Sequence, residues 1–310
     1  MTQEQAFRLV TKVTTNHWNS RLKNLEEIII IANTMLIDRN KRKNYFDTES
    51  LQTSNLLVQK ILLHGSTILF NADGINFPSK YNYDLKIKDP LTLNVIFRSL
   101  LESYLTLNHL NFSKIKDENE VRFKIWIQFG LRQRAKMTFS EIEEKGKELL
   151  NSEKYEIDNL VNEIQSSIYY ASLDNEKKET FMQQISRDWK FGFKGPSYLK
   201  FSWQELLNNS GVNKKLFCDT YNFLSWFAHS TCISLYQLRD MYIDNNEEIE
   251  VNSIIKDASI FIALAITDCI KIDDDLKFQF DNLNQEDKDL INIYNCFFRD
   301  ESYAIDFIKE

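Results

Sequence analysis

The chain has 310 residues, a size that allows one large domain or two modest ones with a substantial core. Hydrophobic residues make up 43% and charged residues 27%, which excludes a disordered protein. Only 7 Gly and 3 Pro are present, where average usage predicts roughly 20 and 15. Because sheets, tight turns and phosphate-binding loops use these residues, their scarcity favours long helices and argues against an open nucleotide-binding α/β fold.

The charge is unevenly distributed, although the net value is only −7. Residues 241–310 contain 6 Lys/Arg and 17 Asp/Glu, whereas the first 240 residues contain 32 and 28. An acidic C-terminal region on a mildly basic body argues against binding duplex DNA through general electrostatics. These counts do not exclude a local basic patch on the surface.

We expect neither a secretion signal nor a membrane span. Met1 is followed by a polar run, and the longest apolar stretches are shorter than the about 20 residues that a bilayer requires. The four cysteines form no C-x-x-C pair, and we interpret them as reduced thiols. These features predict a cytoplasmic protein that does not contact a membrane.

Apolar residues recur at spacings of three and four along most of the chain, which predicts helices. Asp89-Pro90 is a clear helix start, because Asp can cap a helix and Pro fits its first position. Residues 72–88 are expected to form a loop, and residues 39–52 and 173–200 are candidate boundaries. In chain order, we expect helices over residues 2–36, 53–71, 90–111, 118–136, 140–150, 154–172, 202–210, 213–238, 249–271 and 285–298.

The segment 213–238 is the most apolar of the predicted helices. Between positions 216 and 238 its only charged residue is Asp219. Apolar side chains surround the predicted helix on almost all sides, which is typical of a helix buried on most of its surface. We therefore expect it to be the central helix of a bundle.

The predicted fold is all-α, a bundle of eight to ten helices packed around the 213–238 helix. No internal repeat, low-complexity segment or strongly marked linker divides the chain. We therefore expect a single helical domain over residues 1–310, with an N-terminal helical extension over 1–50 and an acidic C-terminal helical region over 241–310.

Familiar catalytic and binding motifs are missing from the sequence. It contains no G-x-x-x-x-G-K-[ST] or G-x-G-x-x-G phosphate loop, no H-E-x-x-H and no G-x-S-x-G. Three consecutive aspartates occupy 273–275, and we interpret them as a solvated acidic turn because no further ligands follow at calcium-loop spacing. The sequence therefore predicts neither a cofactor nor a bound metal ion.

Arg98 and Glu102 are the first candidate site residues. They are four positions apart on one predicted helix, so their side chains share a face and can pair. Their neighbours are apolar, and a desolvated ion pair costs free energy unless it is well satisfied, which often marks a specific role. The alternative is an ordinary surface pair.

Tyr221, Ser225 and His229 are the second set. Their spacing of four places them on one stripe of the predicted central helix. His229 can serve as a general acid or base, because the reference pKa of histidine lies near neutrality. A role of Ser225 as a nucleophile is less well supported than the acid–base role of His229, because the hydroxyl of a helical serine can donate to the backbone carbonyl four residues earlier. Alternatively, these are core polar groups satisfied within the bundle.

These two blocks, R-S-L-L-E at 98–102 and Y-N-F-L-S-W-F-A-H at 221–229, carry a resemblance. They resemble the R-S-L-x-E and Y-x-x-L-S-x-x-x-H blocks of a large group of uncharacterised bacterial all-helical proteins, which often neighbour defence genes. The resemblance covers about residues 50–240. It implies a helical bundle and brings no established reaction.

The helical ribonuclease superfamily of toxin and defence systems is a more distant resemblance. Its signature is Arg, then four to six intervening residues, then His on one helix, whereas here His109 follows Arg98 by eleven positions. Arg98 can still reach His229 from a neighbouring helix. Metal-independent phosphodiester cleavage would then use His229 as acid and base, with Arg98 stabilising the developing charge and Glu102 orienting the bound group.

Aromatic and basic residues alternate in the segment 187–203, which includes Trp189, Lys190, Lys194 and Lys200. Single-stranded nucleic acid binds to surfaces of this kind, because bases stack on the rings and cations meet the phosphates. The alternative is a loop whose aromatic rings anchor it to the bundle while its lysines face water.

Two functions follow from these observations. The leading interpretation is a cytoplasmic bacterial defence or stress protein whose polar site binds or cleaves RNA or another phosphodiester. The alternative is a non-catalytic module in which the same residues form a buried structural network and the surface docks a protein partner. The sequence leaves both enzymatic activity and self-association open.

Overall fold

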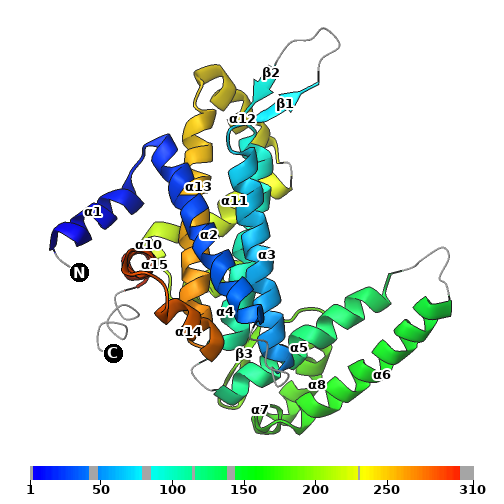
Figure 1. Cartoon of the computed structure of the whole chain (residues 1–310). Coiled ribbons are helices and arrows are strands. Elements are labelled where there is room, and N and C mark those ends of the chain that lie inside the picture. Colours follow the sequence, from blue (N-terminus) through cyan, green and yellow to red (C-terminus); the bar gives the residue numbers. More distant parts are fainter. Residues whose placement is uncertain are drawn as a thin grey trace. The chain divides into compact units, whose positions relative to one another are not determined.

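The computed structural model describes residues 3–41, 48–78, 85–113, 116–137, 144–229 and 231–300. Helices dominate these residues, and their strands form two short hairpins (Figure 1). The prediction of an all-α multi-helix bundle is confirmed. None of the described helices is both long enough and apolar enough to cross a bilayer.

The chain divides into two compact units, where the sequence predicts one domain. Unit 1 comprises residues 1–107 and 207–310, and unit 2 comprises residues 108–206. Both divisions fall inside helices, so no composition change or linker in the sequence marks them.

Unit 1 contains the helices and strands of both chain ends: α1 (Gln3–Thr14), α2 (Trp18–Lys41), α3 (Glu49–Asn71), β1 (Ile75–Phe77), β2 (Leu85–Ile87), most of α4 (Pro90–Asn111), α10 (Lys214–Phe217), α11 (Thr220–Ala228), α12 (Cys232–Asp244), α13 (Glu247–Cys269), α14 (Asp274–Asp281) and α15 (Gln285–Phe298). Unit 2 contains the middle of the chain: α5 (Lys116–Ala135), α6 (Glu144–Ser166), α7 (Ile168–Ser172), α8 (Asn175–Ile185), β3 (Phe191–Lys194), β4 (Ser197–Lys200) and the first part of α9 (Trp203–Asn209).

The buried centre of unit 1 is α13, which packs against α2, α3, α12 and α15 (Figure 1). Every residue from Ala258 to Cys269 is buried. Phe261, in the middle of this run, contacts the rings of Phe97, Tyr104 and Phe217. A helix that is apolar on all sides is stable only where neighbours cover each side, which these elements do.

The prediction of a central helix over 213–238 is wrong. The segment is divided among α10, α11 and the first part of α12, with breaks near Asp219 and Thr231. The Thr231 hydroxyl accepts a hydrogen bond from the Ser234 backbone N–H and caps α12. Short polar side chains of this kind compete with helical backbone bonds. Trp226 is among the exposed side chains, so the apolar composition of the segment did not imply burial.

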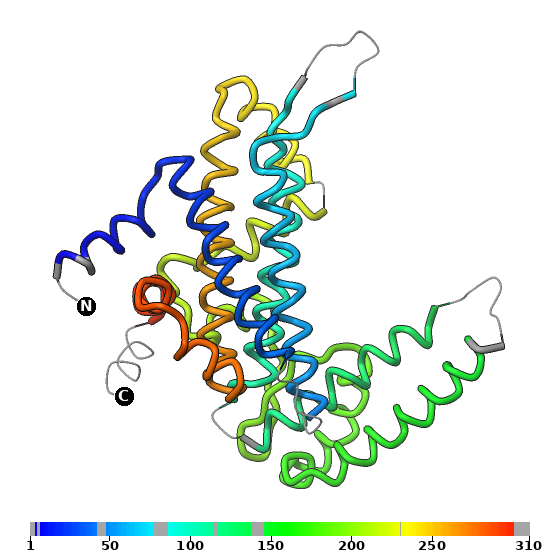
Figure 2. Tube along the Cα trace, in the orientation of Figure 1, coloured from blue at the N-terminus to red at the C-terminus, as the bar shows by residue number. Residues whose placement is uncertain are grey.

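The first predicted helix is also interrupted, and the chain trace turns between α1 and α2 (Figure 2). Arg21 stabilises this turn, because its Nε donates to the Thr15 carbonyl over 2.6 Å and its Nη1 to the Asn252 carbonyl of α13 over 2.8 Å. One side of α2 is buried and packs against α13. Helix α2, which lies within the expected N-terminal extension, therefore belongs to the core of unit 1.

Both hairpins lie where the sequence predicts loops or boundaries. Strands β1 and β2 pair antiparallel within the expected loop 72–88. Strands β3 and β4 pair antiparallel near the end of 173–200, which also contains α8. Gly195 lies in the β3–β4 turn with φ +55°, a backbone conformation that glycine adopts without strain. Strands of three or four residues carry too little alternation to be read from a sequence.

Candidate functional site

Three predicted site residues form a closed polar cluster within unit 1. On α4, the Nε of Arg98 donates to Oε1 of Glu102 over 2.9 Å. From α11, the Tyr221 hydroxyl donates to the same Oε1 over 2.8 Å and accepts from Nη2 of Arg98 over 2.8 Å. The guanidinium also lies 5.1 Å from the centre of the Tyr221 ring. Charge-assisted hydrogen bonds therefore join α11 to α4.

The cluster reaches the surface and favours one protonation state for each partner. Burial raises the pKa of Tyr221 to about 12, and the hydrogen bond to Glu102 adds to this effect. Burial alone would lower the pKa of Arg98, but the hydrogen bonds to Glu102 and Tyr221 raise it overall. The Arg98 side chain is 17% exposed and that of Glu102 is 30% exposed. Arg98 and Tyr221 are therefore unsuited to exchanging a proton near neutral pH.

Ser225 and His229 are not hydrogen-bonded to this cluster through their side chains. The Ser225 hydroxyl donates to the Tyr221 backbone carbonyl over 2.9 Å, which is the back-bond of a helical serine. His229 is the exposed C-cap of α11 and lies eight positions after Tyr221, a rise of about 12 Å along a helix. Its catalytic role stays a prediction.

A further polar contact, not anticipated from the sequence, joins α3 to α4. The Ser99 hydroxyl lies 3.0 Å from Nε2 of His64. Burial, followed by the positive charge of Lys60, lowers the pKa of His64, so this imidazole is neutral at pH 7. Ser99 follows Arg98 directly in the chain. The R-S-L block therefore supplies α4 with one anchor to α11 and another to α3.

The aromatic residues of 187–203 contact one another in unit 2, where Trp189 and Phe191 are buried and the others are half-buried. Trp189 is buried, and its ring centre lies 5.5 Å from that of His109 and 5.7 Å from that of Trp203. Gly192 allows a close approach beside them, because a Cβ at this position would lie 3.0 Å from Nη2 of Arg122. A ring as buried as that of Trp189 cannot stack on a base, so this residue acts as an anchor.

Two of the three predicted lysines in this segment are paired with one carboxylate. Lys190 lies 2.5 Å from Asp188 and 5.2 Å from the centre of the Trp203 ring, and Lys200 lies 3.4 Å from Asp188. Lys194 is exposed at the end of β3. The geometry fits the anchoring alternative better than a stacking surface, and binding of single-stranded nucleic acid stays a prediction.

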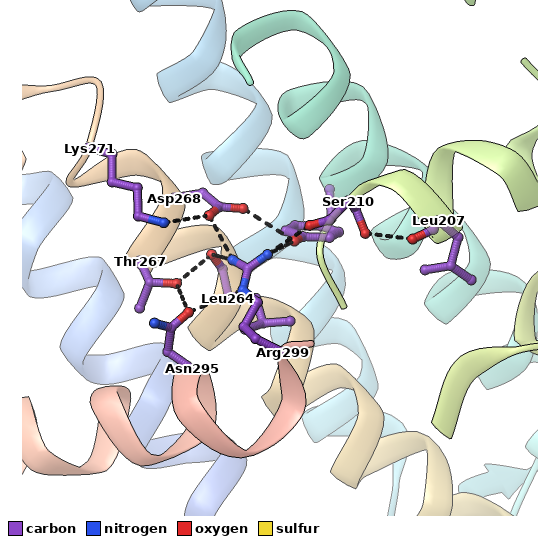
Figure 3. A network of polar contacts seen from close by, with 9 residues as sticks. Leu207, Ser210, Leu264, Thr267, Asp268, Lys271, Asn295 and Arg299 are labelled. Atoms are coloured by element: carbon purple, nitrogen blue, oxygen red, sulfur yellow. Dashed lines mark hydrogen bonds and ion pairs between the residues drawn. The ribbon is translucent and has the colours of Figure 1, made fainter. Parts of the chain in front are cut away.

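A fully buried network surrounds Arg299 in unit 1 (Figure 3). Its Nη2 donates to Oδ1 of Asp268 over 2.7 Å, and its Nη1 donates to the Tyr104 hydroxyl and the Ser210 carbonyl, each over 2.9 Å. Neither charged side chain has any exposed surface. A ligand could not reach this network, so its role is to join the end of α15 to α13, α4 and the Ser210 segment.

The interpretation of the aspartates at 273–275 as a solvated turn is wrong for Asp273, whereas Asp274 is exposed. This residue is buried, and its Oδ2 accepts from Nε of Arg39 over 2.9 Å and from Nδ2 of Asn55 over 3.2 Å. Its Oδ1 caps α14. Within the described part of the chain, no three His, Cys, Asp or Glu side chains are placed to hold a metal ion.

An exposed row of large apolar side chains follows one side of α3. Leu56, Leu63 and Phe70 are 62%, 68% and 83% exposed. Residues seven positions apart lie on the same side of a helix, because two turns cover about seven residues. Lys60 is the only Lys, Arg, Asp or Glu between residues 50 and 71. The seven-residue spacing was readable from the sequence, but the exposure was not.

The neighbouring helix α2 carries the same spacing. Ile30 and Ile37 are seven positions apart and more than half exposed, and α2 packs against α3 (Figure 1). Both helices use their other sides to contact α13. We call the exposed residues Ile30, Ile37, Leu56, Leu63 and Phe70 the α2–α3 apolar face.

Comparison of the chain with protein-family models, with curated proteins and with solved structures found no match. The resemblance to bacterial helical proteins therefore stays a prediction that rests on two sequence blocks.

Proposed function

We propose that this protein is a non-catalytic interaction module whose α2–α3 apolar face binds an amphipathic helix of a partner protein. The observation that carries the proposal is the exposed row Leu56, Leu63 and Phe70. Large apolar side chains that gather on one exposed surface mark sites of association, whereas singly scattered ones are ordinary. Three such side chains at regular spacing on one helix are too ordered to be scattered surface residues.

The spacing argues for a helical partner. Apolar residues that repeat every seven positions keep facing the same neighbour when two helices pack side by side. Two adjacent helices that both show this spacing offer a template for a third helix, bound through its own apolar stripe. An extended peptide would instead require a free strand edge, which α2 and α3 do not provide.

The low charge of α3 supports the same interpretation. Charged residues make up 27% of the chain, yet Lys60 is the only one between residues 50 and 71. Depletion of charged residues is the compositional signal of an interface core. A partner helix of matching chemistry would present Leu, Ile or Phe to this face and keep its charges at the rim.

The polar contacts of α4 have a structural role in this proposal. Arg98, Glu102 and Tyr221 already satisfy one another, and His64 with Ser99 fixes α3 to α4. Anchors of this kind hold a docking helix in one position, which reduces the entropy lost on binding. A bacterial origin, a defence role and a cytoplasmic location rest on the sequence alone and are part of the proposal.

A second candidate function is recognition of a phosphodiester at Arg98. One observation favours it: the Arg98 side chain is partly exposed, and its Nη1 has no hydrogen-bond partner among the described residues. An arginine with a free N–H edge can bind a phosphate oxygen. Glu102 opposes this role, because its carboxylate adds negative charge beside the incoming anion.

The proposal is tested by comparing purifications of the tagged full-length chain from its own cells. The triple variant Leu56→Gln, Leu63→Gln and Phe70→Gln should keep its melting temperature, because the changed side chains are exposed, but should lose a partner that wild type retains. Ile249→Gln is the matched control, since Ile249 is 68% exposed, like Leu63. A partner retained equally by the triple variant would contradict the proposal.

A further inference from the structure

Helix α12 of unit 1 is rich in apolar residues but almost unburied. All 13 of its residues are described, and Ser234 is the buried one among them. Five of its large apolar side chains are between 39% and 68% exposed: Ile233, Leu235, Tyr236, Tyr242 and Ile243. A helix that exposes this much apolar surface gains little from packing within its own chain and is typical of a surface that another chain covers. None of these residues belongs to the α2–α3 apolar face, so the two surfaces can be tested separately.

A row of four residues runs along α12 on the side opposite Ser234. Cys232, Tyr236, Arg239 and Ile243 are spaced by four, three and four positions, which places them on one side of the helix. All four are exposed, and we call them the outer row of α12. Helices that pack side by side contact each other through rows with this alternation of three and four.

The charges at the centre of the outer row complement a second copy of the same helix. Arg239 and Asp240 are the only Lys, Arg, Asp or Glu of α12 before its last residue, and 2.6 Å separates Nη2 from Oδ1. In an antiparallel pair with its two-fold axis between positions 237 and 238, Tyr236 of one copy faces Arg239 of the other. Asp240 then comes beside the same Tyr236, whose hydroxyl can donate to the carboxylate.

The apolar ends of the row complement each other in the same arrangement. The two-fold axis that pairs Tyr236 with Arg239 also brings Ile243 of one copy beside Cys232 and Ile233 of the other. A parallel pair would instead place Arg239 against Arg239 and Asp240 against Asp240, and like charges in contact repel. The sequence of α12 therefore favours an antiparallel pair, in which each contact occurs twice.

We infer that α12 is a dimerisation surface on which two copies of this chain pack antiparallel about a two-fold axis. Each copy covers the apolar side chains that the other exposes, and Arg239 with Asp240 sets the orientation of the two helices. A dimer also accounts for the apolar composition of the 213–238 segment, which burial within one chain does not. One helix of 13 residues per copy covers less than the about 1,200 Å² of a stable complex, so we expect a dissociation constant in the micromolar range.

Sedimentation velocity of the full-length protein measures this association directly. Between about 1 and 300 μM, wild type should pass reversibly from monomer to dimer. The double variant Ile233→Gln and Ile243→Gln should weaken the dimer at least about tenfold, because the two-fold axis repeats each lost apolar contact. Ile168→Gln with Ile249→Gln is the matched control, since these side chains are 67% and 68% exposed and lie outside α12.

The control should dimerise within about twofold of wild type. Both double variants change exposed side chains only and should stay folded, which circular dichroism checks. A wild type that stays monomeric at every concentration, or equal dimer affinities for the two double variants, would overturn the inference.

Disulfide formation tests the antiparallel orientation. In the variant Ile243→Cys, mild oxidation with copper phenanthroline should link position 243 of one copy to Cys232 of the other, which mass spectrometry identifies. Wild type is the control, because its exposed Cys232 should form no link to the second Cys232. A link between two Cys232 residues would show a parallel pair. Absence of the 232–243 link at concentrations where Ile243→Cys sediments as a dimer would place the second copy elsewhere.

Discussion

Arg299 and Asp268 form an ion pair that water does not reach: 2.7 Å separates Nη2 from Oδ1, and neither side chain has exposed surface. Asp268 lies on α13, and Arg299, 31 positions later, directly follows α15. The Tyr104 hydroxyl donates to Asp268 and accepts from Arg299, and Oδ1 of Asn295 accepts from Nε of Arg299. Several segments of unit 1 therefore depend on this ion pair.

Removal of one partner should therefore destabilise the protein strongly. We expect Arg299→Met to lower the free energy of unfolding by about 3–5 kcal/mol, because it leaves Asp268 charged and buried. Arg239→Met is the control, because Arg239 pairs with Asp240 on the surface, where a pair contributes about 0–1 kcal/mol. Denaturant unfolding of both variants measures the difference. Equal losses for the two arginines would show that the buried pair is not a structural centre.

Tyr221→Phe should remove the hydroxyl that joins Arg98 to Glu102. The pKa of Tyr221 is raised to about 12, above the ordinary value near 10, so the folded state holds this proton where the unfolded state releases it. The stabilisation by this proton is complete below about pH 10 and is lost as the pH rises to about 12. Unfolding measured across this range should therefore show a shallower decline for Tyr221→Phe than for wild type. Identical slopes would contradict the cluster.

Burial of His109 in unit 2 should make folding stability fall as the pH is lowered, which is opposite to the effect of Tyr221. Burial, followed by the positive charges of Arg122 and Lys190, holds the pKa of His109 well below 6.5. The unfolded chain takes up a proton as the pH falls below about 6.5, while the folded chain does not, so stability falls there. His109→Phe keeps a ring beside Trp189 and should reduce this fall between about pH 6.5 and 5, whereas the exposed-site control His17→Asn should not. An unchanged fall in His109→Phe would exclude a buried neutral imidazole.

The catalytic alternative is tested with one exposed residue. If the protein is non-catalytic, wild type should cut neither RNA nor single-stranded DNA, and His229→Ala should change stability by less than about 0.5 kcal/mol because His229 is exposed. Digestion assays beside thermal melting provide both readouts. Cleavage by wild type that disappears in a folded His229→Ala variant would replace the interaction module with a nuclease, since acid–base catalysis contributes about 10²–10⁴-fold.

Local signals predicted much of the helical structure. The Asp89-Pro90 start and the 90–111 span agree with α4, and 285–298 agrees with α15. Each depends on capping or periodicity within one segment, which a sequence displays directly. The missed α14 begins with a buried cap, Asp273, whose partner Arg39 is far away in the chain. The sequence alone therefore indicated a surface turn at these aspartates.

Burial was predicted less well than helicity, for a physical reason. The 213–238 segment and α13 are both rich in apolar residues, but only the neighbours of α13 cover all of its sides. Asp268 was a usable signal, because a single charge within an apolar helix must find a partner. Nothing local identified that partner as Arg299, which lies outside any motif. The Arg98–Glu102 pair was predicted from spacing, whereas its partner from the later helix was expected to be His229 and is Tyr221.

The most direct test of the docking proposal is site-specific photo-crosslinking within living cells. A photoreactive phenylalanine analogue is placed at Leu63, and the same analogue at Ile249 serves as a control of equal exposure. We expect Leu63 to crosslink one partner protein at apolar positions spaced by three, four or seven within a helix, and Ile249 to leave that partner unlabelled. Crosslinks from Leu63 that join only copies of this chain, or a partner labelled equally from Ile249, would contradict the account.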